Sequence, residues 1–120
     1  MHDFKKLRLW DWAMDLTVDV YQLTEKFPRH ELFGLTQQLR RSSASVPSNI
    51  AEGAYRNSNK EFFHFLGIAN GSTGEVYTQI ELACRLGYLK SQEANPILEV
   101  TESVRRMIGK LQSTLNKETT

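Results

Sequence analysis

The sequence predicts an all-α fold, an antiparallel up-down-up-down four-helix bundle, on three observations. Apolar or small residues recur at alternating steps of three and four in four separate segments, which is the spacing of one helix face. Connections of about four to eight residues separate these segments and favour antiparallel neighbours. The length of 120 residues suits a single domain. We therefore expect one domain over residues 1–120, with helices at about 7–27, 31–56, 59–87 and 92–116.

The first predicted helix ends at Pro28, because the residue before a proline avoids the helical conformation. Its stripe comprises Leu9, Ala13, Leu16, Val20, Leu23 and Phe27.

The second predicted helix contains Pro47, so we expect a kink in its middle. A proline inside a helix removes one hydrogen bond and crowds the carbonyl four residues earlier, here that of Ser43, at a cost of about 3 kcal/mol. Two interpretations stay open: a kinked but continuous helix, and two shorter helices with Ser45 as a cap. The stripe comprises Leu32, Leu35, Leu39, Ser42, Val46, Ile50 and Gly53.

The third predicted helix has recognisable ends. Ser58 followed by Glu61 is typical of a capping box and places the start near Asn59. Gly87 lies where a left-handed C-cap residue is expected. The stripe comprises Phe62, Leu66, Ala69, Thr73, Val76, Ile80, Ala83 and Gly87.

Three glycines also lie inside this third segment, namely Gly67, Gly71 and Gly74. Each costs up to about 1 kcal/mol relative to alanine in a helix interior. We expect close packing against a neighbouring helix to compensate for that cost.

The fourth predicted helix has two candidate starts. Asn95 and Pro96 resemble an N-cap followed by proline at the first helical position. Alternatively, Ser91 caps the helix and Pro96 lies inside its first turns. The stripe comprises Ile97, Thr101, Val104, Ile108, Leu111 and Leu115.

Composition and charge bear on the class of protein. No apolar run approaches the roughly 20 residues of a membrane span, and the N-terminus lacks the pattern of a signal peptide. The single cysteine, Cys84, cannot form an internal disulfide, so we expect a cytoplasmic protein with no membrane partner. The net charge of +1 lacks the basic excess that dedicated nucleic-acid binders usually carry.

The sequence predicts neither a catalytic site nor a cofactor. The three histidines lie at the chain end or at helix starts, without an obvious nucleophile and carboxylate beside them. Glu61 and His64 have the Glu-x-x-His spacing that supplies metal ligands in ferritin-like bundles. A dimetal site needs a second such motif, and the sequence has none, so we expect no metal site and no enzyme.

Several polar residues surround the predicted kink. Arg40 and Arg41 come shortly before it, and Arg56 follows the second helix. If these arginines converge with Asn49 and Glu52, they form a polar pocket or a phosphate-contacting patch. The alternative is a solvated face with local ion pairs, each of which stabilises the fold only slightly.

More aromatic residues lie outside the four stripes than a monomeric bundle readily buries, which favours a self-association surface. The best candidates for such an interface lie on the third helix: Phe63, Phe65 and Tyr77.

Several motifs together resemble a known family. The most specific is Ser45-Val46-Pro47-Ser48-Asn49-Ile50-Ala51-Glu52-Gly53, and others are Leu9-Trp10, Phe33-Gly34-Leu35-Thr36, Gln38-Leu39-Arg40-Arg41 and Leu86-Gly87-Tyr88-Leu89. With them the chain resembles, over about residues 4–115, the bacterial four-helix bundle proteins named after the 23S rRNA intervening sequence.

The resemblance implies a ring-shaped homopentamer. It also implies a connection with RNA, because some members are encoded inside intervening sequences of large-subunit ribosomal RNA genes. A similar fold occurs in the accessory variability determinant of diversity-generating retroelements, a basic pentamer that binds nucleic acid and the reverse transcriptase. The near-neutral charge of this chain departs from that relative.

Two alternative functions are therefore expected. The first is a non-catalytic homopentameric bundle that binds RNA, or a nucleic-acid-processing partner, through arginines near the helix-two kink. The second is a protein-interaction or structural oligomer with no nucleic-acid role.

Overall fold

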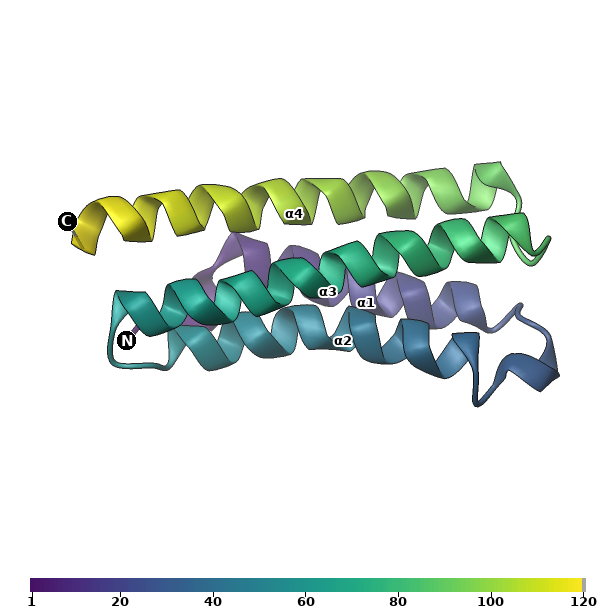
Figure 1. The fold of residues 1–120 in the computed structure, drawn as a ribbon, viewed down its shortest axis with the longest axis horizontal. Helices are drawn as coiled ribbons and strands as arrows, with labels where there is room; N and C mark the ends of the chain where they lie inside the picture. The colour runs from purple at the N-terminus through teal and green to yellow at the C-terminus, as the bar shows by residue number, and fades with distance from the viewer. Residues whose placement is uncertain (120) are drawn as a thin grey trace.

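The computed structural model describes residues 1–119 and shows four α-helices packed against one another, with no strand in the described part (Figure 1). The predicted all-α fold is confirmed. Two short 3-10 turns, η1 (Phe4–Lys6) and η2 (Arg29–Glu31), precede the first and second helices. The helices are α1 (Arg8–Thr24), α2 (Leu35–Ala54), α3 (Asn59–Arg85) and α4 (Ser91–Thr119).

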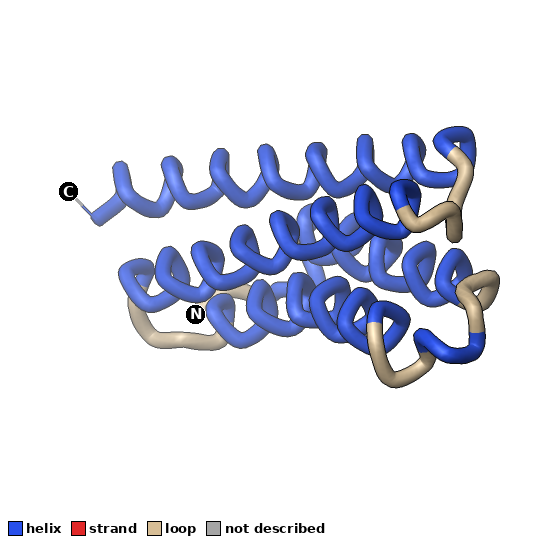
Figure 2. Tube along the Cα trace, turned by 45° about the vertical axis from the view of Figure 1, so that its right-hand side comes forward, coloured by secondary structure: helices blue, strands red, loops and turns tan. Residues whose placement is uncertain are grey.

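Successive helices run in opposite directions along a body of 48 × 23 × 20 Å (Figure 1). Short connections join them at the two ends of the molecule (Figure 2). α1 packs against α2 and α4, and α3 packs against the same two helices. In the described residues no Cα atom of α1 lies within 8 Å of a Cα atom of α3, so these two helices occupy opposite corners of the bundle.

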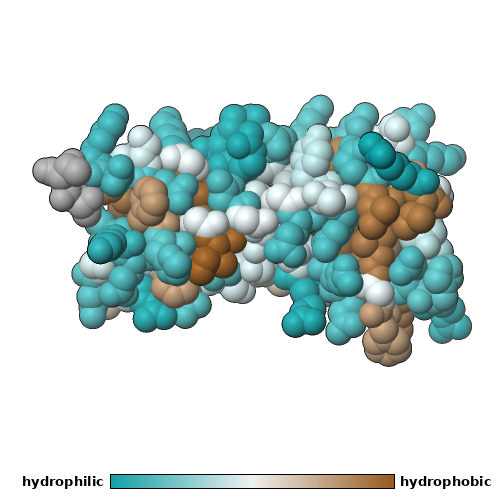
Figure 3. Space-filling model, viewed as in Figure 1, coloured by the Kyte–Doolittle hydropathy of each residue, from teal (hydrophilic) through white to brown (hydrophobic). Residues whose placement is uncertain are grey.

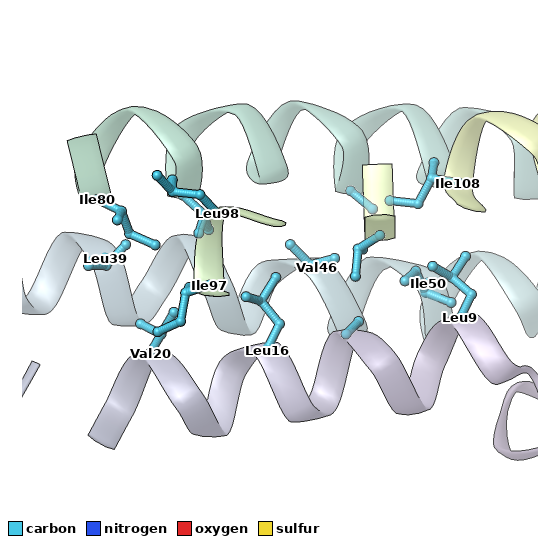
Figure 4. Packing of buried hydrophobic residues seen from close by; sticks show 14 of the residues in the cluster. Leu9, Leu16, Val20, Leu39, Val46, Ile50, Ile80, Ile97, Leu98 and Ile108 are labelled. Carbon is cyan, nitrogen blue, oxygen red and sulfur yellow. The ribbon is translucent and has the colours of Figure 1, made fainter. Parts of the chain in front are cut away.

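The core is built from the predicted stripes of all four helices. Figure 4 shows Leu39 of α2 beside Ile80 of α3, and Val20 of α1 beside Ile97 of α4. Phe62 of α3 is 1% exposed and is the largest fully buried side chain. Most side chains of the four predicted stripes are therefore buried, as helix periodicity indicated.

The predicted start of the second helix was wrong, because α2 begins at Leu35 and Leu32 is exposed. The cause is the Glu31 carboxylate, whose Oε1 accepts a hydrogen bond from the Leu35 N–H at 3.1 Å. A Cβ at Gly34 would lie 2.6 Å from that same oxygen, so glycine leaves room for this cap. The first helix likewise ends at Thr24, and Phe27 is buried outside it.

α2 continues through Pro47, so the interpretation with two shorter helices was wrong. Pro47 leaves the Ser43 carbonyl without its usual amide partner. The Thr17 hydroxyl of α1 lies 2.9 Å from that carbonyl and donates a hydrogen bond to it. A side chain from the neighbouring helix thus replaces the bond that the proline removes.

The ends of α3 follow the capping predictions. The Ser58 Oγ accepts from the Glu61 N–H at 3.1 Å, and the helix starts at Asn59. Gly87 has φ +82° at the C-terminal end, and the Tyr88 N–H donates to the Ala83 carbonyl at 2.9 Å. This bond and the positive φ of Gly87 are characteristic of a Schellman motif.

α4 begins at Ser91, so the start at Asn95 and Pro96 was wrong, and Pro96 lies inside the helix. The side chain of Glu93 accepts from the Lys90 N–H at 3.0 Å and thereby satisfies a free donor at the helix start. Among the described helices, none is both long enough and apolar enough to cross a membrane.

Candidate functional site

The structure does not bring the three arginines together. Arg40 lies on α2, and Arg56 lies two residues past its end at Ala54. The stretch of helix from Arg40 to Ala54 alone corresponds to about 21 Å at 1.5 Å per residue. Arg40 contacts α1, whereas Arg56 contacts α3. The predicted convergence near the kink was therefore wrong, because the length of α2 separates the two arginines.

Arg40 holds the end of α1. Its Nε donates to the Thr24 hydroxyl at 2.8 Å, and its Nη2 donates to the Tyr21 carbonyl at 3.3 Å. The guanidinium also lies 4.9 Å from the centre of the Tyr21 ring and within 3.4 Å of the Glu25 carboxylate. A cation at a helix C-terminus satisfies free carbonyls and the helix dipole, so Arg40 has a structural task.

Arg56 pairs with Glu52 one turn earlier, at 2.9 Å between Nη2 and Oε1. Its guanidinium lies 4.8 Å from the centre of the Phe65 ring on α3. Both charged side chains are about half exposed, so this pair adds little stability on its own. The alternative of local ion pairs describes this end of α2.

Asn49 belongs to a polar seam between α2 and α3. Its Nδ2 donates to the Ser45 carbonyl at 2.8 Å and to the Ser45 hydroxyl at 2.9 Å. The Ser45 and Ser72 hydroxyls are 2.8 Å apart, and Ser72 donates to the Ile68 carbonyl at 3.3 Å. Either hydroxyl can donate to the other across this contact. The chain of bonds fixes the register of the two helices.

Arg41 is the one predicted arginine that has no ion pair in the described part of the chain. It is exposed and lines a groove of about 460 Å³ between α2 and α3. The Ser42 hydroxyl in this groove donates to the Gln79 amide oxygen at 2.7 Å. The other lining residues are Gln38, Ser45, Ser72 and Glu75.

The outer face of α3 beside this groove is unusually bare. A Cβ added at Gly71 or Gly74 would meet no atom within 4 Å, and at Gly67 it would meet only the Gln112 side chain, at 3.6 Å. The expected close packing against a neighbouring helix was therefore wrong for Gly71 and Gly74 within this chain, whereas Gly67 lies at ordinary contact distance from α4. Figure 3 shows pale surface along the middle of α3 and an apolar patch toward its C-terminal end. Two apolar side chains on α3, Ile68 and Leu82, are 42% and 45% exposed, and Leu86 directly after the helix is 49% exposed.

The three aromatic interface candidates do not share one face. Phe63 is 40% exposed, but Phe65 and Tyr77 are only partly exposed. Phe65 lies under Arg56 on the α2 side, whereas Tyr77 lines a groove of about 490 Å³ between α3 and α4. At 100° per residue, two positions separate Phe63 from Phe65 by about 200°, so one flat partner cannot cover both.

An exposed apolar stripe on α1 was not among the features predicted from the sequence. Met14, Val18 and Tyr21 are 40%, 50% and 44% exposed. They recur at steps of four and three on the side opposite the buried Leu16 and Val20. This second set of apolar residues at helical spacing was the signal in the sequence that could have predicted the stripe. Acidic residues accompany the stripe: Asp11, Asp15 and Asp19.

Of the histidines, His2 and His30 contact other parts of the fold, whereas His64 contacts a neighbour on its own helix. The His2 Nε2 lies 3.3 Å from the Asn59 Oδ1, and its ring lies 5.1 Å from the ring of Phe62. The His64 ring packs edge-on against Phe65. Within residues 1–119, no three His, Cys, Asp or Glu side chains lie close enough together to hold a metal ion.

Two of three comparisons with known proteins gave a match. A family model described as "23S rRNA-intervening sequence protein" matches residues 5–110. A crystal structure from Bacteroides thetaiotaomicron, of a protein with unknown function from the S23 ribosomal protein family, is similar with a TM-score of 0.78. The two chains are 20% identical, and the match covers 87% of this chain and 97% of the other, so it shows the fold. A comparison with curated proteins gave no match. Since the family model covers most of its length, the chain belongs to the 23S rRNA-intervening sequence protein family.

Proposed function

We propose that this protein is a non-catalytic bundle whose function is to assemble with copies of itself, as a homopentamer. The observation that carries the proposal is the outer face of α3, where Gly71 and Gly74 have open space around them. The exposed Ile68 and Leu82 lie on the same helix. Helices that pack closely on a partner commonly place small residues at the contact, which lets the backbones approach.

The energetics of these glycines support a partner. In an exposed helix interior, alanine is more stable than glycine by about 0.5–1 kcal/mol, so two such glycines weaken the isolated chain. At position 53 the chain itself explains the glycine, because an added Cβ would lie 2.7 Å from the Phe65 Cβ. Gly71, Gly74 and Gly109 have no such reason within the chain. Gly71 and Gly74 differ from Gly109 because the exposed Ile68 and Leu82 lie on the same helix, and a second helix on this face would cover the glycines and the apolar side chains together. The number of subunits, five, comes from the family resemblance.

The experiment compares two glycine variants that are alike in the isolated chain. Gly71→Leu places a large side chain on the α3 face, and Gly109→Leu places the same side chain at an open position on α4. Both should fold, because neither added Cβ meets an atom within 4 Å. Light scattering coupled to size exclusion should show a smaller assembly for Gly71→Leu only. An assembly of unchanged mass in Gly71→Leu would contradict the proposed face.

A second candidate function is binding of RNA or of a nucleic-acid-processing partner. The specific observation in its favour is Arg41, which is exposed and lacks a carboxylate partner beside a polar groove. A free guanidinium is well suited to a phosphate. The near-neutral net charge of +1 weighs against strong binding.

Fluorescence anisotropy with a structured RNA at low and physiological salt tests this candidate. Arg41→Ala should weaken binding and lower the salt slope by about one, whereas Arg105→Ala, which removes an arginine already paired with Glu102, should change both less. Absence of binding at low salt, or equal effects of the two variants, would contradict a role for Arg41 in binding RNA.

A further inference from the structure

We propose that the surface which covers the α3 glycines is the outer face of α1 from a second copy of this chain. The inference rests on the proposed self-assembly and names the two surfaces that meet. The donor surface is the α1 stripe, defined as Met14, Val18 and Tyr21. The acceptor surface is the α3 face, defined as Ile68, Gly71, Gly74 and Leu82.

The two surfaces match in shape. The α1 stripe presents side chains that stand out from the helix, because all three are at least 40% exposed. The α3 face presents the opposite relief, with a shallow depression of about 430 Å³ lined by Gly71, Gly74 and Thr78 among others. Side chains from one helix filling the space above glycines on another is how close helix pairs pack. The exposed side chains of the α1 stripe would thus fill the open space above the α3 glycines.

The two surfaces also match in charge. Between Leu9 and Thr24, α1 carries Asp11, Asp15 and Asp19 and no lysine or arginine. In the described residues none of these aspartates has an ion pair, and Asp15 and Asp19 lie one turn apart with like charge. Burial, together with the charge of Asp15, raises the pKa of the Asp19 carboxyl. A cation brought close to these carboxylates would relieve this repulsion.

The acceptor side supplies such cations. Arg41 and Arg85 are both exposed near the α3 face and have no ion pair in the described chain. Glu75 lines both the Arg41 groove and the glycine depression, and it is the acidic group that opposes this match. Placing the α1 stripe on the α3 face brings the aspartates of one copy near these arginines of the other. This arrangement assigns Arg41 to the subunit contact.

The positions of the two helices determine the kind of assembly. α1 and α3 occupy opposite corners of the bundle, so their outer faces point away from each other. A contact between α1 of one copy and α3 of the next is head-to-tail, and each copy keeps one unused surface of each kind for another neighbour. Repeated head-to-tail contacts either close into a ring or continue as a filament. A two-fold dimer, by contrast, would pair a surface with itself.

A mixing experiment with two blocked variants tests this pairing. Val18→Arg blocks the α1 stripe, and Gly71→Arg blocks the α3 face, both at exposed positions. Each variant alone should have the mass of one chain, 13.8 kDa in the unmodified protein, by native mass spectrometry. An equal mixture should give a species of two chains and nothing larger. The α1 stripe of Gly71→Arg and the α3 face of Val18→Arg remain unblocked, so each pair of chains can form one contact. Gly109→Arg serves as the control and should assemble like the unmodified protein.

Three outcomes overturn the pairing, and they separate it from the proposed function. If Val18→Arg still assembles alone, α1 is not the partner surface, although self-assembly through α3 stands. If both variants are single chains and their mixture stays so, the two surfaces do not meet each other. If the unmodified chain itself remains single, self-assembly fails and the pairing fails with it. Circular dichroism of each variant checks that the helices are formed.

Discussion

Glycine has opposite consequences at different positions of this chain. At Gly53, where α2 meets α3, an added Cβ would lie 2.7 Å from the Phe65 Cβ and 3.0 Å from a ring carbon of Phe62. The Phe62 side chain is fully buried and cannot move without disturbing the core. At Gly109 on α4 the same added atom meets nothing within 4 Å. One residue type is therefore required in one place and replaceable in another.

This contrast gives a prediction at the residue scale. Gly53→Ala should lower the free energy of unfolding by about 1–3 kcal/mol, because α2 and α3 must separate slightly to admit the methyl group. Gly109→Ala should raise it by about 0.5–1 kcal/mol, because alanine favours the helix and nothing obstructs it. Urea unfolding followed by circular dichroism measures both. A Gly53→Ala protein as stable as the parent would contradict the close contact.

Residue identity alone allowed some of these features to be predicted. Ser58, Glu61 and Gly87 act on backbone groups within one turn, so the limits of α3 could be read directly from the sequence. The Thr17 bond to the Ser43 carbonyl spans 26 positions and depends on how α1 lies against α2. No local pattern in the sequence specifies that distance, so residue identity alone could not predict this hydrogen bond.

At the scale of the helix, α2 tolerates Pro47 because α1 supplies a substitute hydrogen bond. The Thr17 hydroxyl lies 2.9 Å from the Ser43 carbonyl and also 2.9 Å from the Ala13 carbonyl in its own helix. Its single proton is shared between these two acceptors. The bond joins two elements of the bundle at the position where α2 lacks one of its own bonds, so it couples helix integrity to helix packing.

A double-mutant cycle tests this coupling. Thr17→Val keeps the shape of the side chain and removes the donor, so it should cost about 0.5–1.5 kcal/mol of unfolding free energy. In a Pro47→Ala background the backbone N–H of residue 47 becomes available to the Ser43 carbonyl, and Thr17→Val should then cost less than half as much. Equal costs in the two backgrounds would show that Thr17 does not compensate for the proline.

The same scale explains where the candidate site departed from expectation. Arg40, Arg41 and Arg56 flank one motif in the sequence, yet α2 continues without a break from Arg40 to Ala54 and carries the chain away from Arg40 before it reaches Arg56. Arg40 and Arg41 are adjacent but point to different neighbours, the first to α1 and the second into the groove against α3. Proximity in sequence therefore predicted the helix correctly and the site incorrectly.

At the scale of the whole molecule, the bundle has buried its core and still carries surfaces that the single chain does not explain. The outer face of α3 holds open glycines and exposed apolar side chains. The outer face of α1 holds exposed apolar side chains beside unpaired aspartates. These faces lie at opposite corners, which is the arrangement that head-to-tail assembly needs.

Stripe spacing predicted the inward sides of the helices, because burial in the core imposes a period on each segment. The outward sides obey no such rule within one chain, and the aromatic residues chosen from their surplus alone turned out to lie on different faces. Exposure of Met14 and Val18 depends on which side of α1 the rest of the bundle covers. The assembly surfaces therefore became visible only with the packed structure.

Native mass spectrometry of the unmodified chain at micromolar concentration tests the central claim most directly. One chain has a mass of 13.8 kDa, so the account predicts a dominant species of about five times that mass, about 69 kDa, with few smaller assemblies. A spectrum that contains only the 13.8 kDa chain up to high concentration would contradict self-assembly, and with it the function proposed for the α3 face.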